Sequence, residues 1–474
     1  MNLPKPLIAL LFLFTAFSLK IFSQSDTFDI SEFKLPEIHR RQLDFNADFY
    51  GYSNTSEYID TSVYGNDKHS SVNGKMNIHF SSFQNTRKVQ SRSSATLILN
   101  GSGHKYNSQS QNDEVKEQSY SPLFSLDLER RRYFKNETFL GTSAFLHFLY
   151  NYDNSTTDYP SVEYPQKNYS LSTVIPIAVG KGRIEPVQDA RQALYIIDAL
   201  EKEGRLRKDI NRRDIENFAD LVAKLNSERY FDYRIQRMHE LEALDSFLVA
   251  NHLVRESDAR YFTVLSDYWD YGNRQARYSG NRISVELYPG YNLYNSTTYE
   301  SPYEALIIYG GLEFIHEKPI NLYWQNTLRV YSYAGKIKSL DKDKNLFNYL
   351  YAIPDLSLGI SQIISYYPNT RTNMSLNYGL TWGNNFKGSD GSEANHGLGL
   401  NGRFNINYYF SPQLRLNFTA YANYFWQGNP EKRPIAAIYS RDFLNFISNY
   451  SQLSTFEKHS LQPGFSLSFT YMLF

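Results

Sequence analysis

The chain contains ten histidines, the side chains that act most readily as bases or metal ligands near neutral pH. None stands with a serine, a carboxylate or a second histidine at a spacing that marks a catalytic dyad or triad, and no HExxH motif occurs. The chain has no cysteine, which excludes thiolate metal sites and disulfides. The sequence therefore predicts no catalytic residue, no metal site and no cofactor. The histidines are His39, His69, His79, His104, His147, His239, His252, His316, His396 and His459.

A glycine-flanked basic stretch, Gly180-Lys181-Gly182-Arg183, has the composition of a phosphate-binding loop. It lacks the spacing and the terminal Lys-Ser or Lys-Thr pair of a P-loop. Pro186 follows, and a helical periodicity begins directly after it. We interpret Gly180, Gly182 and Pro186 as a flexible hinge that turns the chain from a strand into a helix.

Six charged residues fall on the polar side of segments in which apolar and polar residues alternate. In a strand the two alternating sets point to opposite faces. If the polar faces surround a wet interior, these side chains line it and select among polar solutes. The predicted lumen-lining residues are Arg277, Arg282, Glu286, Arg329, Arg403 and Arg415.

The composition limits the kind of protein that carries these residues. The 49 basic and 49 acidic side chains cancel, so no net field favours nucleic acid, and no nucleic-acid partner is expected. A mean hydropathy of −0.52 is too polar for a helical membrane protein. The 40 tyrosines and 32 phenylalanines are typical of a barrel with a wet inside and aromatic girdles outside.

The N-terminus predicts export. Lys5 precedes an apolar run from Leu7 to Leu19, and Ser23 offers a cleavage point, so residues 1–23 are predicted to be a signal peptide. A retained anchor helix needs about 17–25 apolar residues, and Lys20 interrupts this run too early. Residues 24–41 would then form a periplasmic N-terminal segment.

Alternation persists over about ten residues or more in many segments, as in membrane strands, whereas strands of a soluble sandwich average about 5–6 residues. We predict about fourteen strands, with twelve to sixteen open because 435–450 could hold another hairpin. Strands 1–6 occupy 42–181 and strands 7–14 occupy 281–474. Short turns, such as 85–88 and 411–412, alternate with long polar connections, which are 55–71, 105–117, 154–167, 335–347, 386–393 and 428–459.

Between the two sets of strands, residues 182–280 change to a helical period. Four amphipathic helices are predicted there, the first ending at Gly204 and the fourth capped by Ser257. The strand count places this insert on the side of the short turns. It could form a compact periplasmic unit, cap the mouth of a barrel, or fold into the lumen as a plug.

The signal peptide, the alternating strands, the aromatic enrichment and the terminal Phe474 together resemble Gram-negative outer-membrane β-barrel proteins, in a porin-like or transporter-like way. The resemblance implies an all-β transmembrane antiparallel barrel with a helical insert, located in the cell outer membrane. It also implies contact with outer-membrane lipid and recognition by the barrel-assembly machinery of Phe469, Tyr471 and Phe474.

Three functions remain open at this point. The preferred one is a channel or transporter for small hydrophilic or amphipathic solutes. The alternative is a membrane-anchored scaffold whose residues 183–278 dock a periplasmic protein of an export or envelope-assembly system. The third is a barrel enzyme, which would require a Ser-His or Asp-His pair within hydrogen-bonding distance.

Overall fold

One antiparallel sheet of 16 strands dominates the computed structural model of the chain. The structure describes residues 28–60, 63–108, 113–158, 161–207, 210–228, 233–272, 276–297, 302–340, 354–386, 394–411, 414–428 and 458–471. In chain order the first eight strands are β1 (Ile38–Asp60), β2 (Val63–Asn85), β3 (Val89–Ser108), β4 (Asp113–Tyr133), β5 (Thr138–Asp158), β6 (Ser161–Val174), β7 (Ile177–Lys181) and β8 (Ile184–Pro186). The remaining strands are β9 (Tyr278–Ser296), β10 (Tyr303–Pro319), β11 (Trp324–Ser339), β12 (Leu356–Asn369), β13 (Thr372–Asn385), β14 (Asn395–Tyr409), β15 (Leu414–Gln427) and β16 (His459–Tyr471).

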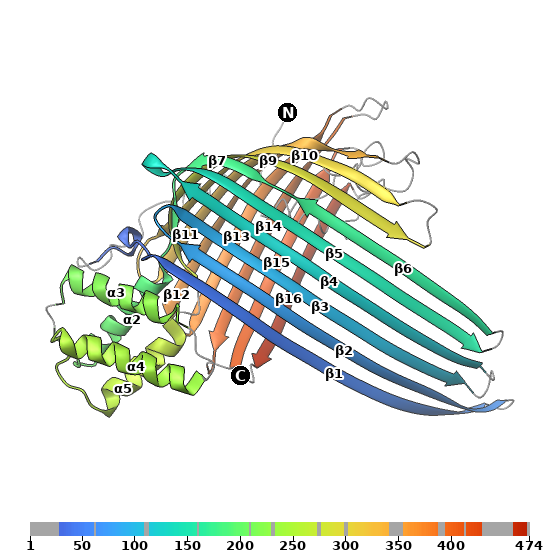
Figure 1. The fold of residues 1–474 in the computed structure, drawn as a ribbon, viewed down its shortest axis with the longest axis horizontal. Helices are drawn as coiled ribbons and strands as arrows, with labels where there is room; N and C mark the ends of the chain where they lie inside the picture. Colours follow the sequence, from blue (N-terminus) through green and yellow to red (C-terminus); the bar gives the residue numbers. More distant parts are fainter. Residues whose placement is uncertain are drawn as a thin grey trace.

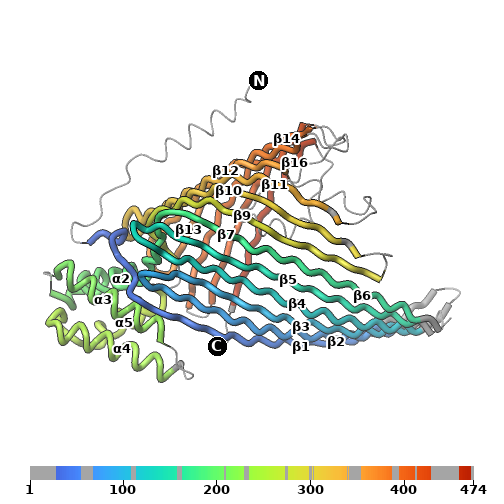
Figure 2. Tube along the Cα trace, turned by 45° about the horizontal axis from the view of Figure 1, so that its top comes forward, coloured from blue at the N-terminus to red at the C-terminus, as the bar shows by residue number. Residues whose placement is uncertain are grey.

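Fourteen of these strands follow one path in which each pairs with the next along the chain, except that β6 is followed by β9. This is the order of an up-and-down barrel. The short strands β7 and β8 lie off the path and pair with β9. Both views show the sheet curling on itself, so that the last strands lie behind the first ones (Figures 1 and 2). The sheet order confirms the predicted fold class.

The alternation of side chains explains why β9 forms a strand with two different faces. Ile283, Val285 and Leu287 are exposed on one face, whereas Ser284 and Tyr288 are buried on the other. A one-residue slip in register would exchange the two sets, so the pattern also fixes the pairing of β9 with β10. The outward apolar set continues on neighbouring strands with Ile177, Val179, Leu306, Ile308, Leu312 and Val330.

Tyrosines fill much of the inner face of β9–β12. Tyr331 and Tyr333 lie 5.3 Å apart between ring centroids, and Tyr333 also meets Tyr288 edge-on at 5.7 Å. Each of two rings lies over a glycine of the next strand, Tyr333 over Gly311 and Tyr331 over Gly359, where an added Cβ would overlap the ring. Glycine is therefore required at these positions to let a large aromatic ring lie flat on the sheet.

The first five strands are longer than the sequence predicted. The polar segments 55–71, 105–117 and 154–167 were expected to be loops, but most of their residues continue the ladders, with pairs such as Ser56–Asp67 and Lys105–Lys116. That prediction was wrong because Asn and Asp, which are frequent in these segments, disfavour strands individually, while cross-strand pairing overrides such propensities. Figure 2 shows this group of strands continuing past the ends of β9 and β10.

A single strand was predicted over 168–181, and the structure divides it into β6 and β7. Pro176 lies between them and has no backbone N–H to donate to a ladder. The pairing nevertheless continues along β9, since the Ile175 N–H donates to the Pro289 carbonyl over 2.9 Å. The two short strands therefore act as one interrupted strand of the barrel wall.

The two ends of the path are unpaired edges among the described residues, because β1 pairs with β2 alone and β16 with β15 alone. Apolar side chains on both edge strands are largely exposed. On β1 they are Leu43, Phe45 and Phe49, and on β16 they are Leu461, Phe465, Leu467 and Phe469. The curled sheet thus has a seam between its first and last strands.

The helical unit lies between β8 and β9 and extends from one end of the sheet (Figure 1). It contains α2 (Gln188–Lys202), α3 (Arg212–Leu225), α4 (Tyr233–Ala250) and α5 (Ala259–Gly272), so the four predicted helices are present. Gly204 has a φ of +69° just after α2, as expected of a glycine at a helix end. No helix among the described residues is both long and apolar enough to span a lipid bilayer.

The sequence predicted Ser257 as the cap of α5, but the residue that caps this helix is Asp258. The Asp258 carboxylate accepts a hydrogen bond from the Tyr261 backbone N–H over 2.9 Å and pairs with Arg205 over 2.7 Å. The hydrogen bond from the Tyr261 N–H is the largest cause that holds the pKa of Asp258 below its ordinary value, and the pairing with Arg205 lowers this pKa further. The two neighbouring residues are both good caps, and the pairing with Arg205 favours the carboxylate.

The segment that precedes β1 belongs to the core of the helical unit. A short 3₁₀ turn, η1 (Ile30–Glu32), buries Phe28, Ile30 and Phe33 among the side chains of α2–α5. Arg212 on α3 pairs with Glu32 over 2.5 Å. Residues from the start of the chain and from its middle therefore share one apolar core. The helical members of that core include Ala190, Ile196, Leu200, Phe218, Val222, Leu244, Leu248 and Leu265.

Candidate functional site

Arg277 joins the helical unit to the end of the sheet. It is fully buried directly before β9 and donates hydrogen bonds to the carbonyl oxygens of Asn321 (2.8 Å) and Leu322 (2.7 Å) in the β10–β11 turn and of Trp324 (2.6 Å) at the start of β11. It also donates to Gln325 over 3.2 Å. A planar guanidinium can satisfy such a set of acceptors at once. Arg277 was predicted to line a lumen, and the structure places it at this buried junction instead, because turn carbonyls offer it partners.

Helix α2 packs on the neighbouring end of β12, next to the β12–β13 turn. The Tyr195 hydroxyl donates to the Tyr367 carbonyl over 3.2 Å and to the Leu322 carbonyl over 3.4 Å. The guanidinium of Arg191 lies 4.7 Å from the centre of the Tyr367 ring. Burial raises the pKa of Tyr195 to about 12, so the hydroxyl keeps its proton and remains a donor at neutral pH.

Two ion pairs complete the attachment. Arg40 at the start of β1 pairs with the buried Asp189 of α2 over 2.7 Å, and Arg371 in the β12–β13 turn pairs with Asp267 of α5. The Arg371 guanidinium also lies 4.3 Å from the Tyr271 ring centre. The helical unit is therefore held to the short-turn end of the sheet from β1 to β13.

The predicted hinge residues lie in paired structure. Gly180 belongs to β7, and Pro186 ends β8 opposite Tyr278 of β9. Gly182 has a φ of +95° between the two strands, and an added Cβ would overlap the Asn281 carbonyl. These glycines permit close approach to β9, and the chain leaves the sheet at Val187. That the segment acts as a flexible hinge stays a prediction.

Charged side chains gather on the inner face of the sheet next to this junction. Glu313 of β10 is 5% exposed and accepts from Arg282 of β9 over 3.2 Å and from Arg329 of β11 over 2.6 Å. Glu129 and Arg131 form an ion pair on β4. A buried carboxylate shared by two arginines is stabilised by both charges, and removing one partner would leave an uncompensated charge.

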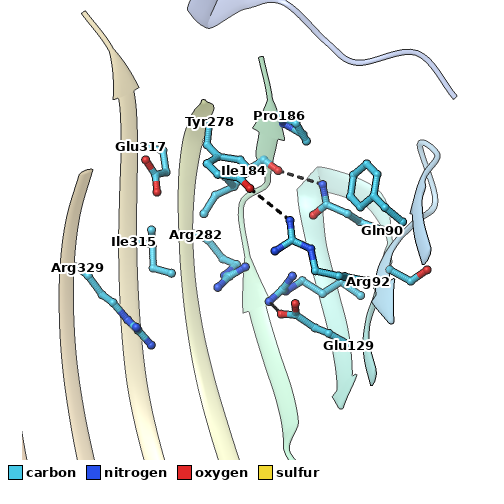
Figure 3. A pocket seen from close by; sticks show the side chains of 13 residues that line it. Gln90, Arg92, Glu129, Ile184, Pro186, Tyr278, Arg282, Ile315, Glu317 and Arg329 are labelled. Atoms are coloured by element: carbon cyan, nitrogen blue, oxygen red, sulfur yellow. Dashed lines mark hydrogen bonds and ion pairs between the residues drawn. The ribbon is translucent and has the colours of Figure 1, made fainter. Parts of the chain in front are cut away.

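A cavity of about 420 Å³ opens among these groups (Figure 3). Its walls come from β2–β4 on one side and β9–β11 on the other, with β8 between them. Figure 3 shows Arg92, Arg282 and Arg329 directed toward this space from both sides. The lining residues that carry charge are Arg92, Glu129, Arg131, Arg282, Glu317 and Arg329.

A second cavity of about 450 Å³ adjoins the same arginines and includes Glu286 and Tyr288. The Glu286 carboxylate accepts from Ser284 over 2.7 Å and from the Tyr288 hydroxyl. Three of the six predicted lumen residues, Arg282, Glu286 and Arg329, thus lie around these two adjoining charged cavities. That they line a conducting lumen stays a prediction.

The other two candidates lie apart from this cluster. Arg403 on β14 is exposed and donates to Asn405 over 3.1 Å, and Arg415 is the second residue of β15. Sequence reasoning missed four residues of the cluster, namely Arg92, Glu129, Arg131 and Glu313. Part of their signal was present, since Glu129 and Glu313 each follow an apolar residue, Leu128 and Leu312, that is exposed on the opposite face of the strand.

A serine and a histidine do approach each other in the sheet. His39 Nε2 lies 3.2 Å from Ser82 Oγ, and Arg41 Nε donates to the same ring nitrogen over 3.3 Å. The Arg41 contact takes up the ring nitrogen that faces Ser82, and no carboxylate is hydrogen-bonded to the His39 ring among the described residues. No group of three or more potential metal ligands occurs in the described part of the chain. This pair gives catalysis no support.

The predicted terminal signals are described in part. Phe469 lies on β16 and is exposed, and the backbone of Tyr471 pairs with Leu414. Phe474, the predicted signal peptide of residues 1–23, and residues 24–27 of the predicted periplasmic segment lie outside the described residues. Export by a signal peptide and recognition of the terminal aromatic residues by the assembly machinery stay predictions.

Comparison with protein-family models gives no match, and neither does comparison with characterised protein sequences. Solved structures with similar arrangements exist. The translocator domain of the autotransporter NalP from Neisseria meningitidis has 9% identity and a TM-score of 0.25, with 79% of this chain and 88% of that one covered. The alcaligin outer membrane receptor FauA from Bordetella pertussis has 8% identity and a TM-score of 0.28, with 91% and 59% covered.

A BenF-like porin from Pseudomonas fluorescens has 7% identity and a TM-score of 0.24, with 92% of this chain and 99% of that one covered. In all three solved structures the sequence identity to this chain is below 10%.

Proposed function

We propose that the chain is an outer-membrane β-barrel that acts as a channel or transporter for small hydrophilic or amphipathic solutes. The observation that carries this proposal is the contrast between the two faces of β9–β11. Apolar side chains such as Val285 and Ile308 are exposed outward, while Arg282, Glu313 and Arg329 surround cavities on the opposite face. Lipid outside and water inside would account for both faces.

The strand lengths support a membrane location. The fourteen strands of the path have 13–23 residues, and a tilted transmembrane strand needs about 9–11. The surplus in β1–β5 would project from the bilayer on the side away from the helices. Outer-membrane lipid and the barrel-assembly machinery are the partners that this proposal implies.

The helical unit would then sit on the periplasmic mouth, since it is attached to the short turns that such barrels place in the periplasm. Its four-point attachment through Arg40, Tyr195, Arg277 and Arg371 makes a mouth cap the favoured placement. A cap of this kind would restrict the entry and exit of solutes.

Single-channel conductance in planar bilayers tests the proposal. The wild type is compared with a variant in which residues 187–276 are replaced by a short Gly-Ser linker. The linker is feasible because Pro186 and Tyr278 are paired neighbours in the sheet. We expect steady conductance that increases in the variant. Absence of conductance from both proteins, with each barrel shown to be folded, would contradict the proposed channel.

A second candidate, a scaffold that docks a periplasmic protein, is favoured by one observation. Met238 and Ile235 on α4 are 67% and 54% exposed, and Val249 on α4 and Phe262 on α5 are also exposed. Exposed apolar residues on one helix are typical of protein contacts. The scaffold predicts that protein extracted in mild detergent forms a complex that a Met238→Ser, Val249→Ser variant loses. A monomer in both cases would exclude it.

A further inference from the structure

Arg92 of β3 projects into the cavity of about 420 Å³ from the wall opposite Arg282 and Arg329 (Figure 3). Its guanidinium donates one hydrogen bond, to the Tyr278 hydroxyl over 3.3 Å. Its direct cross-strand neighbour is Glu129, but that carboxylate is paired with Arg131. Within the described residues no carboxylate lies at ion-pairing distance from Arg92.

The charges around the cavity do not balance. Four arginines and two glutamates line it. Glu313, which lies just behind, is shared between Arg282 and Arg329 and neutralises one of these two charges. Arg131 and Glu129 neutralise each other. After the carboxylate of Glu317 is also counted, one positive charge remains in excess, and Arg92 is the arginine without a carboxylate partner.

The remaining walls are apolar. Phe83 of β2, Ile184 and Pro186 of β8, and Ile315 of β10 line the same cavity. A guanidinium presents parallel N–H donors that match the two oxygens of a carboxylate. A ligand with a carboxylate at one end and an apolar body at the other would therefore satisfy both kinds of wall.

We propose that this cavity is a binding subsite for small amphipathic carboxylates, with Arg92 holding the carboxylate group and Phe83, Ile184 and Ile315 contacting the apolar body. The inference rests on the proposed function in one respect, because it names the solute class that the barrel would admit. Arg282 and Arg329 add long-range attraction for the anion, and Glu313 keeps their side chains in place.

Equilibrium binding to the purified full chain in detergent tests the subsite without a membrane. Benzoate is the probe, and benzylamine is a probe of the same size with the opposite charge. We expect benzoate to bind the wild type at least about tenfold more tightly than benzylamine does. Arg92→Gln should weaken benzoate binding by about tenfold or more, which is typical for loss of a charged hydrogen-bonding partner.

Arg132→Gln is the matched control, because it also removes the charge of one arginine. Arg132 follows Arg131 on β4, and its exposed side chain lies on the face of the strand away from the cavity. Arg132→Gln should leave benzoate affinity unchanged within about twofold. If Arg92→Gln does not fold, Arg92→Lys provides the comparison, because it keeps the charge, loses the paired donors and should give an intermediate affinity.

Equal benzoate affinity in the wild type and the Arg92 variant would overturn the subsite, as would equal affinity for the two probes or no benzoate binding up to roughly 10 mM. Benzoate binding by a protein that conducts no ions would contradict the channel and keep the subsite. Conductance without benzoate binding would keep the channel and exclude the subsite.

Discussion

The Tyr195 hydroxyl on α2 donates a hydrogen bond to the backbone carbonyl of Tyr367, 3.2 Å away near the end of β12. The ring of Tyr367 contacts the guanidinium groups of Arg191 at 4.7 Å and Arg277 at 5.3 Å. One residue at the end of a strand thus receives a hydrogen bond on its backbone and two cations on its side chain. The position of the helical unit depends on the backbone of the turns as much as on their side chains.

Tyr195→Phe should loosen this attachment without disturbing the sheet. The change removes one buried donor and leaves two carbonyl acceptors with fewer partners, a loss of about 1 kcal/mol. We expect faster hydrogen exchange in α2 and α5, measured by mass spectrometry, and unchanged exchange in β9–β12. Tyr164→Phe, at an exposed position on β6, is the control and should change neither. Unaltered exchange in the helices of Tyr195→Phe would show that this bond does not hold the unit.

The same hydroxyl predicts a dependence on alkaline pH. Burial raises the pKa of Tyr195 to about 12, and the unfolded value is about 10. Since the docked state holds the proton more tightly, its contribution to stability is complete below about pH 10 and is lost as pH rises through about 12. The difference in hydrogen exchange of the helices between the wild type and Tyr195→Phe should therefore become smaller over that pH range. A difference that stays constant would contradict the assigned cause.

Arg277→Lys should destabilise the junction although it conserves charge. A lysine ammonium cannot reach the Asn321, Leu322 and Trp324 carbonyls together as the planar guanidinium does. We expect a loss of about 3 kcal/mol, seen as a lower urea midpoint for the helical unit. Arg403→Lys, which alters an exposed arginine on β14, is the comparison and should leave the midpoint in place. Equal midpoints for both variants would show that the buried bonds contribute little.

Gly359→Ala tests the packing of tyrosines on glycines. The added methyl group would overlap the Tyr331 ring, whose hydroxyl is hydrogen-bonded to Thr381 over 3.0 Å. Overpacking of this kind costs about 1–3 kcal/mol. Gly103→Ala on β3 is the matched control, because nothing lies within 4 Å of its added Cβ. In thermal unfolding, Gly359→Ala should melt at a lower temperature than Gly103→Ala. Equal melting temperatures would contradict the packing argument.

The seam between β1 and β16 should be closed in a bilayer. Unpaired backbone groups cost several kcal/mol each in lipid, so the two edges have to find partners there. The chain has no cysteine, so a cysteine at Phe45 can be combined with one at Phe465, Leu467 or Phe469 without background. We expect intramolecular cross-links in lipid vesicles in one register. Cross-links between two chains and none within a chain would indicate pairing with a second copy instead.

The sequence predicted the sheet better than the site. The alternation at Ile283–Tyr288 identifies a strand and its two faces, because burial on one face sets the pattern locally. Arg277 could not be placed from the pattern, because its acceptors lie in a turn more than forty residues away in the chain. Arg92 was missed for a different reason: its importance depends on Glu129 turning to Arg131, and only the arrangement in space shows that choice. The long ladders of β1–β5 escaped prediction because pairing partners outweigh the local preferences of Asn and Ser.

The shared core of the helical unit has a consequence for the order of assembly. Phe28, Ile30 and Phe33 precede the first strand, whereas their apolar partners on α2–α5 come after the eighth. The core cannot be completed until residues up to α5 have emerged, and its completion closes a loop that contains β1–β8. The later strands pair with their neighbours along the chain, so the hairpins from β9 onward do not depend on this long loop closure. In a chain that lacks residues 28–35, we therefore expect β1–β8 to refold more slowly than in the wild type. The hairpins from β9 onward should form at the same rate in both.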